Sequence, residues 1–225
     1  MSGLIKFFQD GGFWMYPIAL VMTVGIVIAI ERFIYLFRER TRNQSVWAAL
    51  QPALNAGDFR KAHDIASQSS AALGRMVAYG LQRVGQVRRA EDLEMALEEG
   101  LMEIMPRLEK RTGYISMFAN IATLLGLLGT IVGLIDAFAA IANANPAEKA
   151  NLLSSSIAVA MNTTAFGLVA AIPLLMLFTY LQSQTSEIVD SLEMASVKFA
   201  NLVRKAQTDR EAAAAARAQA AAPRA

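Results

Sequence analysis

The chain has 225 residues, of which 55% are hydrophobic and 18% are charged, and its formal net charge is +2. This composition is too apolar for an ordinary soluble domain and too charged for a fully embedded one, so part of the chain must stand in water. The absence of cysteine and the single histidine, His63, exclude disulfides, a cysteine nucleophile and a histidine-rich metal site. Since no phosphate-binding loop or nucleophile motif occurs either, we expect no enzyme activity, no cofactor and no nucleic-acid partner.

Three apolar runs are long enough to cross a membrane, which takes roughly 20 residues. We predict transmembrane helices at residues 13–37, 113–142 and 156–182. Glu31 and Arg32 follow the core of the first run without a small-residue cleavage site, so we expect this run to remain as an anchor. Residues 1–12 before it predict an interfacial segment that lies against membrane lipid.

The lysines and arginines are distributed very unevenly along the chain. Segment 32–111 holds 13 of them and segment 182–225 holds 6, hence 19 of the 21. The positive-inside rule therefore predicts that both segments are cytoplasmic. The N-terminus and the short loop 143–155 are then periplasmic, and the C-terminus is cytoplasmic.

Residues 38–112 predict a cytoplasmic helical insert, because no strand-like alternation occurs in them. Asp58 follows a turn and is expected to cap the next helix. Leucines then recur at steps of three and four residues, so we expect a single helix from about Glu91 to Ala142, kinked at Pro106. Four acidic residues on this helix either face a vestibule or neighbouring subunits, or are simply solvated: Glu94, Glu98, Glu99 and Glu103.

The helical pattern of the third span continues into a cytoplasmic helix at 183–207. The alanine-rich tail 208–225 is of low complexity and is expected to be disordered or a frayed helix. The predicted fold is therefore an all-α membrane protein with three transmembrane helices, a helical cytoplasmic insert and long helices that extend into the cytoplasm.

Glycines and polar residues stand in the middle of the second and third spans. Gly126, Gly129 and Gly133 predict close helix packing. The polar residues are one amide and four hydroxyls: Thr123, Thr130, Asn162, Thr163 and Thr164. Uncharged oxygens can replace a cation's hydration shell, which favours an ion path. The alternative is hydrogen bonding between helices or to the residue's own backbone, worth only about 0.6 kcal/mol per bond.

Asp136 is the carboxylate nearest the membrane in the second and third spans. It can attract cations at the mouth of a pore, or it can simply reach the interface. No carboxylate stands at mid-membrane in either span. If ions cross here, the titrating group must come from another chain.

Two stretches resemble the pore-lining helices of the MotA/TolQ/ExbB family of ion-motive-force transducers. They are Arg107 to Phe138, with the motif GLLGT-x-x-G, and Ser154 to Pro173, with TTA-x-GL-x-x-AIP, which also contains Gly167. The three-span layout resembles the TolQ/ExbB branch. The resemblance implies a homopentamer around two copies of a single-span partner of the ExbD/TolR/MotB type, whose membrane aspartate carries a proton or a sodium ion. It also implies that Thr130 and Thr164 line the route.

This chain departs from the family pattern at two positions. Val159 stands where ExbB and TolQ proteins typically have glutamate, and Thr123 stands where many relatives have proline. The resulting path is more polar but uncharged, which raises the hypothesis that sodium is the coupling ion.

The resemblance implies the channel subunit of an ion-driven motor complex in a bacterial inner membrane. Such a complex powers TonB-type import, Tol-type envelope maintenance, or gliding or other motility. The alternative is a non-conducting membrane scaffold for an envelope complex.

Overall fold

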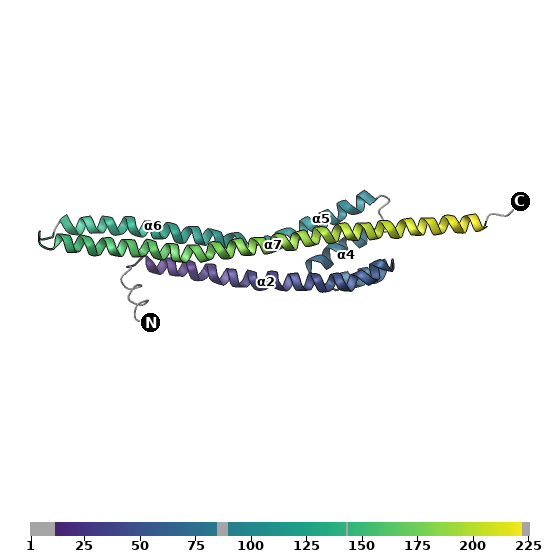
Figure 1. Ribbon diagram of the computed structural model, residues 1–225, viewed down its shortest axis with the longest axis horizontal. Coiled ribbons are helices and arrows are strands. Elements are labelled where there is room, and N and C mark those ends of the chain that lie inside the picture. The colour runs from purple at the N-terminus through teal and green to yellow at the C-terminus, as the bar shows by residue number, and fades with distance from the viewer. Residues whose placement is uncertain (1–11, 85–89, 143, 222–225) are drawn as a thin grey trace. The chain divides into compact units, whose positions relative to one another are not determined.

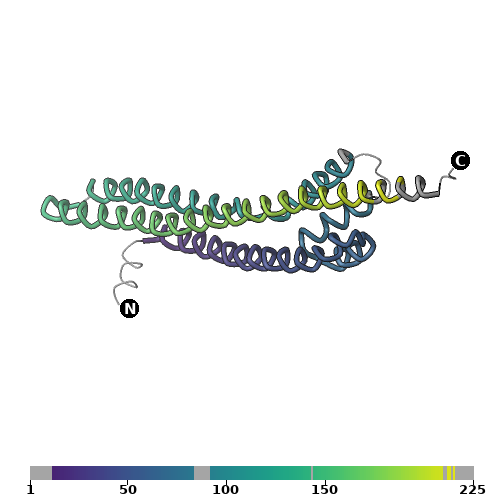
Figure 2. Tube along the Cα trace, turned by 45° about the vertical axis from the view of Figure 1, so that its right-hand side comes forward, coloured from purple at the N-terminus to yellow at the C-terminus, as the bar shows by residue number. Residues whose placement is uncertain are grey.

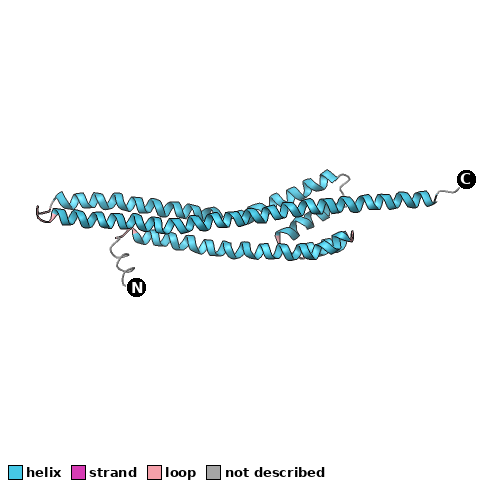
Figure 3. Cartoon of the chain, in the orientation of Figure 1, coloured by secondary structure: helices cyan, strands magenta, loops and turns pink. Residues whose placement is uncertain are grey.

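The computed structural model describes residues 12–84, 90–142 and 144–221, and every regular element in these ranges is an α-helix (Figures 1 and 3). The helices are α2 (Met15–Asn55), α3 (Phe59–Ser67), α4 (Ala72–Val84), α5 (Ala90–Glu109), α6 (Thr112–Ala142) and α7 (Lys149–Ala221). The predicted all-α class is confirmed. The interfacial segment expected at residues 1–12 lies, except for Gly12, outside the described residues.

The chain forms two compact units. The first, which we call the membrane unit, contains residues 1–34 and 110–183. The second, which we call the insert unit, contains residues 35–109 and 184–225. Helices α2 and α7 each contribute residues to both units.

Three helical stretches are long and apolar enough to cross a membrane. They are Met15–Asn55, Asp92–Ala142 and Lys149–Asp209, with mean hydropathies of 2.1, 2.2 and 2.0 in their most apolar windows. Only 22%, 17% and 28% of those windows is buried within the chain. Most of their apolar side chains are therefore left for lipid or for other chains, as expected of membrane helices. The prediction of three helices long and apolar enough to span a membrane is confirmed.

The helix that was expected to run unbroken from Glu91 to Ala142 is in fact two helices. Helix α5 ends at Glu109 and α6 begins at Thr112. Between them Arg111 has φ of 68°, a left-handed conformation that ends helices and is uncommon outside glycine. The expectation was wrong because a non-glycine residue takes the conformation that sequence patterns assign to glycine. Pro106 lies within α5 without ending it.

The insert unit has a core of large aliphatic and aromatic side chains. Asp58 caps α3 as predicted, since its Oδ1 accepts the Lys61 backbone N–H at 3.1 Å. Fully buried side chains come from all five helices of the unit, and the largest are Leu50, Leu54, Met76, Leu97, Leu108, Leu192 and Phe199. Their burial from water drives the folding of this unit.

Two side chains of α2 cap the start of α4 from about thirty residues away. The Glu39 carboxylate accepts the Ala72 N–H at 2.6 Å, and the Asn43 carbonyl accepts the Leu73 N–H at 3.0 Å. Glu39 is 4% exposed and Asn43 is 6% exposed. These bonds satisfy backbone donors that the first turn of a helix leaves without a partner.

Helix α7 is longer than the sequence suggested at both ends. It begins at Lys149, inside the loop expected at 143–155. It continues to Ala221, through most of the tail for which disorder was one expectation. Alanine has the highest intrinsic helix propensity, which explains why this tail is helical without an apolar face.

Candidate functional site

Helices α6 and α7 approach each other closely at two glycines of the membrane unit, Gly126 and Gly167. A Cβ built on Gly167 would lie 2.8 Å from the Ala122 carbonyl oxygen and 3.0 Å from the Gly126 Cα. These neighbours are backbone atoms and cannot rotate away. Both views of the chain show α6 beside the first part of α7 (Figures 1 and 2). Helices that pack through small residues can associate tightly in lipid, where burial from water gives no driving force.

The two later glycines of α6, Gly129 and Gly133, also lie against α7. A Cβ on Gly129 would collide with the Cγ2 of Thr163 and lie 3.2 Å from the Cβ of Trp14. A Cβ on Gly133 would lie 3.1 Å from the Cβ of Ala160. The structure thus brings all four glycines of the two motifs into one α6–α7 contact.

Hydroxyl groups from α7 are part of this contact. Thr164 Oγ1 donates across the contact to the Gly126 carbonyl oxygen at 2.8 Å. Thr163 is 2% exposed and donates to the Val159 carbonyl oxygen, one turn earlier in its own helix, at 3.0 Å. Both hydroxyls of the TTA motif therefore have backbone acceptors.

The hydroxyls of α6 lie on the more exposed part of that helix. Thr130 donates to the Leu127 carbonyl oxygen at 2.6 Å, and Thr123 donates to the Ala119 carbonyl oxygen at 3.2 Å. Thr123 is exposed and Thr130 is half-buried. Thr130 and Thr164, which the family resemblance places along the route, donate to different carbonyls and not to each other.

The remaining polar residues of the predicted set are open to another chain. Asn162 is half-buried, and no hydrogen bond engages its amide among the residues that the structure describes. Asp136 is exposed near the end of α6. Since an unbonded amide is costly in lipid, these side chains are expected to face water or a further chain.

One close contact of this unit was not predicted from the sequence. A Cβ on Gly25 of α2 would lie 2.9 Å from the Cδ2 of Leu174 on α7, so α2 also packs tightly against α7. The signal was available, since Gly25 is a glycine inside an apolar run. In the same unit, Glu31 of α2 pairs with Arg111 at 3.3 Å.

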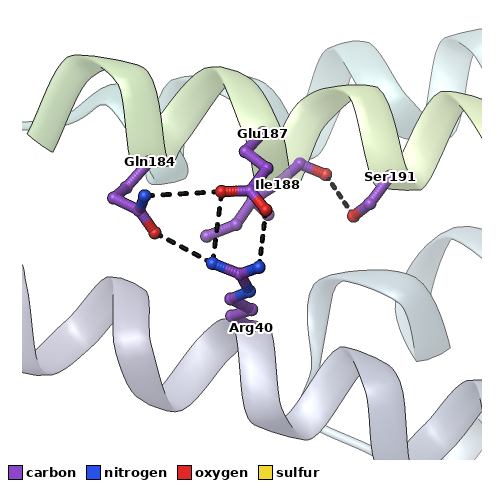
Figure 4. A network of polar contacts seen from close by, with 5 residues as sticks. All are labelled: Arg40, Gln184, Glu187, Ile188 and Ser191. Carbon is purple, nitrogen blue, oxygen red and sulfur yellow. Dashed lines mark hydrogen bonds and ion pairs between the residues drawn. The ribbon is translucent and has the colours of Figure 1, made fainter. Parts of the chain in front are cut away.

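The insert unit contains a separate polar cluster. Arg40 Nη2 and Nη1 contact the two carboxylate oxygens of Glu187 at 2.5 and 3.1 Å, and Nη1 also donates to Gln184 Oε1 at 3.2 Å (Figure 4). This bidentate pair lies at the edge of a cavity of about 240 Å³ between α2, α4 and α7. Because both side chains are about half exposed, the pair contributes little stability but fixes the orientation of Arg40.

Two of the acidic residues of α5 have cationic partners within the same unit. Glu94 pairs with Arg204 at 2.8 Å, and Glu99 pairs with Arg83 at 3.2 Å. A hydrogen bond to Glu99 raises the pKa of Tyr79 above its usual value. Both carboxylates form ion pairs while remaining exposed.

Comparison with known proteins identifies the family of this chain. The profile of the MotA/TolQ/ExbB proton channel family matches residues 68–194. The chain belongs to the MotA/TolQ/ExbB proton channel family. The match covers more than half of the chain and contains the whole α6–α7 contact. It is a family of channels rather than of enzymes.

The relatives place the chain in the TolQ/ExbB-like branch of the family. An ExbB homologue from Methanothermobacter thermautotrophicus, a biopolymer transport protein by name, is 28% identical over 193 residues, which cover 85% of this chain and 67% of the homologue. The biopolymer transport protein exbB1 of Vibrio cholerae is 26% identical over 179 residues, or 77% and 76% of the two chains. The Tol-Pal system protein TolQ of Haemophilus influenzae is 35% identical over 81 residues, or 36% and 35%.

Proposed function

We propose that this chain is the channel-forming subunit of an ion-motive-force-driven complex in a bacterial inner membrane. It converts ion flow into mechanical work on the envelope, in TonB-type import, Tol-type maintenance, or gliding or other motility. The observation that carries the proposal is the Gly126–Gly167 contact, with threonine hydroxyls in the same stretch of both helices, in a member of a proton channel family.

The proposed path gives the polar residues two different tasks. Thr164 donates across the contact to Gly126, so it holds α6 and α7 in register, whereas Thr163 donates within α7 and packs its methyl group against Gly129. Thr123 and Thr130 lie on the more exposed part of α6, so they supply oxygen atoms to the path. Asn162 is available to another chain, and Asp136 attracts cations at the mouth.

The titrating carboxylate is proposed to come from a partner. The sequence gives the predicted spans of α6 and α7 no carboxylate near their middle, and Val159 stands where the family resemblance implies a glutamate. The proposed assembly is a homopentamer around two copies of a single-span protein of the ExbD/TolR/MotB type. The N-terminus is proposed to be periplasmic and the C-terminus cytoplasmic, from the distribution of lysine and arginine.

The coupling ion is proposed to be a proton, with sodium as the competing choice because the path is polar and uncharged. The decisive comparison measures work by the complex in sodium-free medium and in the presence of a protonophore. Continued work without sodium contradicts the sodium hypothesis, and continued work with the protonophore contradicts the proton.

A specific observation favours the competing function, a non-conducting scaffold. All four threonine hydroxyls of the candidate path donate to backbone carbonyl oxygens, as they would in a purely structural contact. A scaffold would use the α6–α7 contact for assembly alone.

A double substitution distinguishes the two functions. Thr123→Ala with Thr130→Ala should leave assembly intact, because both hydroxyls donate only to carbonyls of α6, but it should reduce ion flux in vesicles that contain the chain and its partner. The matched control is Thr23→Ala with Thr179→Ala, because these exposed threonines also donate to carbonyls of their own helices. Equal flux in both double variants would support the scaffold and contradict the channel.

A further inference from the structure

Two exposed arginines, Arg38 and Arg42, lie on one side of α2 in the insert unit. Being four residues apart, they are neighbours on the helix surface. Neither has an ion pair or a hydrogen bond within the part of the chain that the structure describes. Like charges at this spacing destabilise a helix, so an anion from outside the chain would stabilise the pair.

The polar residues between and beside them have partners within the insert unit. Arg40 binds Glu187 and Gln184 (Figure 4), while Glu39 and Asn43 cap α4. In this stretch of α2, the residues that point toward the rest of the insert unit form hydrogen bonds or an ion pair within it. The two arginines on the outer side form neither with any residue that the structure describes.

An exposed aromatic side chain adjoins the two arginines. Phe37 is 65% exposed and directly precedes Arg38 in the sequence. Thr41, on the same side of the helix, donates its hydroxyl back to the Phe37 carbonyl oxygen at 3.0 Å. The predicted membrane span 13–37 ends at Phe37, so this side of α2 changes from apolar to cationic within a single turn.

We propose that Phe37, Arg38 and Arg42 form a binding site for an anionic phospholipid. The guanidinium groups bind the headgroup phosphate, which their planar donors match in geometry and charge. The phenyl ring of Phe37 packs against the start of an acyl chain, where the membrane interface favours aromatic residues. Charge complementarity and position at the end of a membrane span identify a lipid as the occupant. This site does not depend on whether the chain conducts ions.

The test uses the full-length chain in neutral detergent, titrated with phosphatidylglycerol or phosphatidylcholine and followed by native mass spectrometry. Arg38→Gln with Arg42→Gln should lower phosphatidylglycerol affinity about 25-fold, at about fivefold per arginine near a membrane surface. Phosphatidylcholine binding should not change. The matched control is Arg60→Gln with Lys61→Gln, which removes two exposed cations from α3 and should change affinity less than about twofold. If the double variant does not fold, each single arginine variant should show its own fivefold loss.

Several results would overturn the proposal. One is an unmodified chain that binds both lipids equally, and another is a control that loses as much affinity as the double variant. Competition by inorganic phosphate at lipid concentrations would mean that the site binds phosphate without a lipid. A changed number of subunits in the double variant would mean that this side of α2 contacts another protein chain.

Discussion

The membrane unit and the insert unit are each stabilised by a different kind of packing. In the membrane unit, α6 and α7 meet through glycine and alanine, and many of their large apolar side chains remain exposed. In the insert unit, large side chains such as Leu97 and Phe199 are fully buried. The difference follows from the solvent, because burial drives folding in water, whereas close backbone approach and hydrogen bonds hold helices in lipid. Truncating a large core side chain should therefore destabilise the insert unit, whereas adding a side chain at a glycine of the α6–α7 contact should destabilise the membrane unit.

The largest expected effect is in the core of the insert unit. Phe199→Ala removes a fully buried ring from α7 and should destabilise the unit by about 3–5 kcal/mol. The measurement is the urea concentration at which the far-ultraviolet circular dichroism of this helical unit is lost. Phe37→Ala, at an exposed phenyl, is the control. An equal loss in both variants would contradict the assignment of Phe199 to a core.

The second effect comes from enlarging a side chain instead of truncating one. Gly167→Ala adds one methyl group where backbone atoms lie 2.8 and 3.0 Å away, and it should cost about 1–3 kcal/mol through separation of α6 and α7. Gly113→Ala, near the start of α6, has no atom within 4 Å of the added Cβ and should be neutral or stabilising. The midpoint of thermal unfolding in detergent compares the two. A stable Gly167→Ala variant would show that the contact tolerates bulk.

The third effect concerns the buried cap of α4. Glu39→Ala leaves the Ala72 N–H without its acceptor and should cost about 2 kcal/mol, a typical value for a hydrogen bond to a charged group. Glu39→Gln keeps an acceptor oxygen and should recover about half of the loss. Urea unfolding of the two variants measures both values. If Gln and Ala cost the same, the carboxylate does not cap α4.

The smallest effect is at the break between α5 and α6. Arg111→Gly removes the strain of a left-handed side chain but gives up its exposed ion pair with Glu31, so it should stabilise the chain by about 1 kcal/mol. Arg111→Ala gives up the same ion pair while keeping a Cβ, and it should not stabilise the chain. A thermal midpoint that falls in the glycine variant would contradict a left-handed residue at this position.

The parts of the fold that were predictable are those with a local cause. Apolar runs predicted the three spans, and Asp58 predicted the start of α3. The spacing of Gly126, Gly129 and Gly133 predicted close packing along the second span. Each of these predictions depends on residues within one or two turns of each other.

The parts that were not predictable depend on residues far apart in the chain or on an unusual backbone. Arg111 ends α5 in a conformation that sequence patterns reserve for glycine. Glu39 and Asn43 cap a helix about thirty residues away, and Thr164 bonds to Gly126, which lies 38 residues earlier in the chain. Periodicity within a helix carries no information about such partners.

The central claim, that α6 contributes to a hydrated ion path, is tested most directly by chemical access to Thr130. The chain contains no cysteine, so a single Thr130→Cys substitution introduces the only thiol. A charged, membrane-impermeant thiol reagent reacts with the thiolate, which forms in water and not in lipid. In the complex assembled with its partner, Thr130→Cys should react at least about tenfold faster than Val27→Cys, an exposed apolar position on α2. Equal, slow reaction at both positions would contradict a hydrated path along α6.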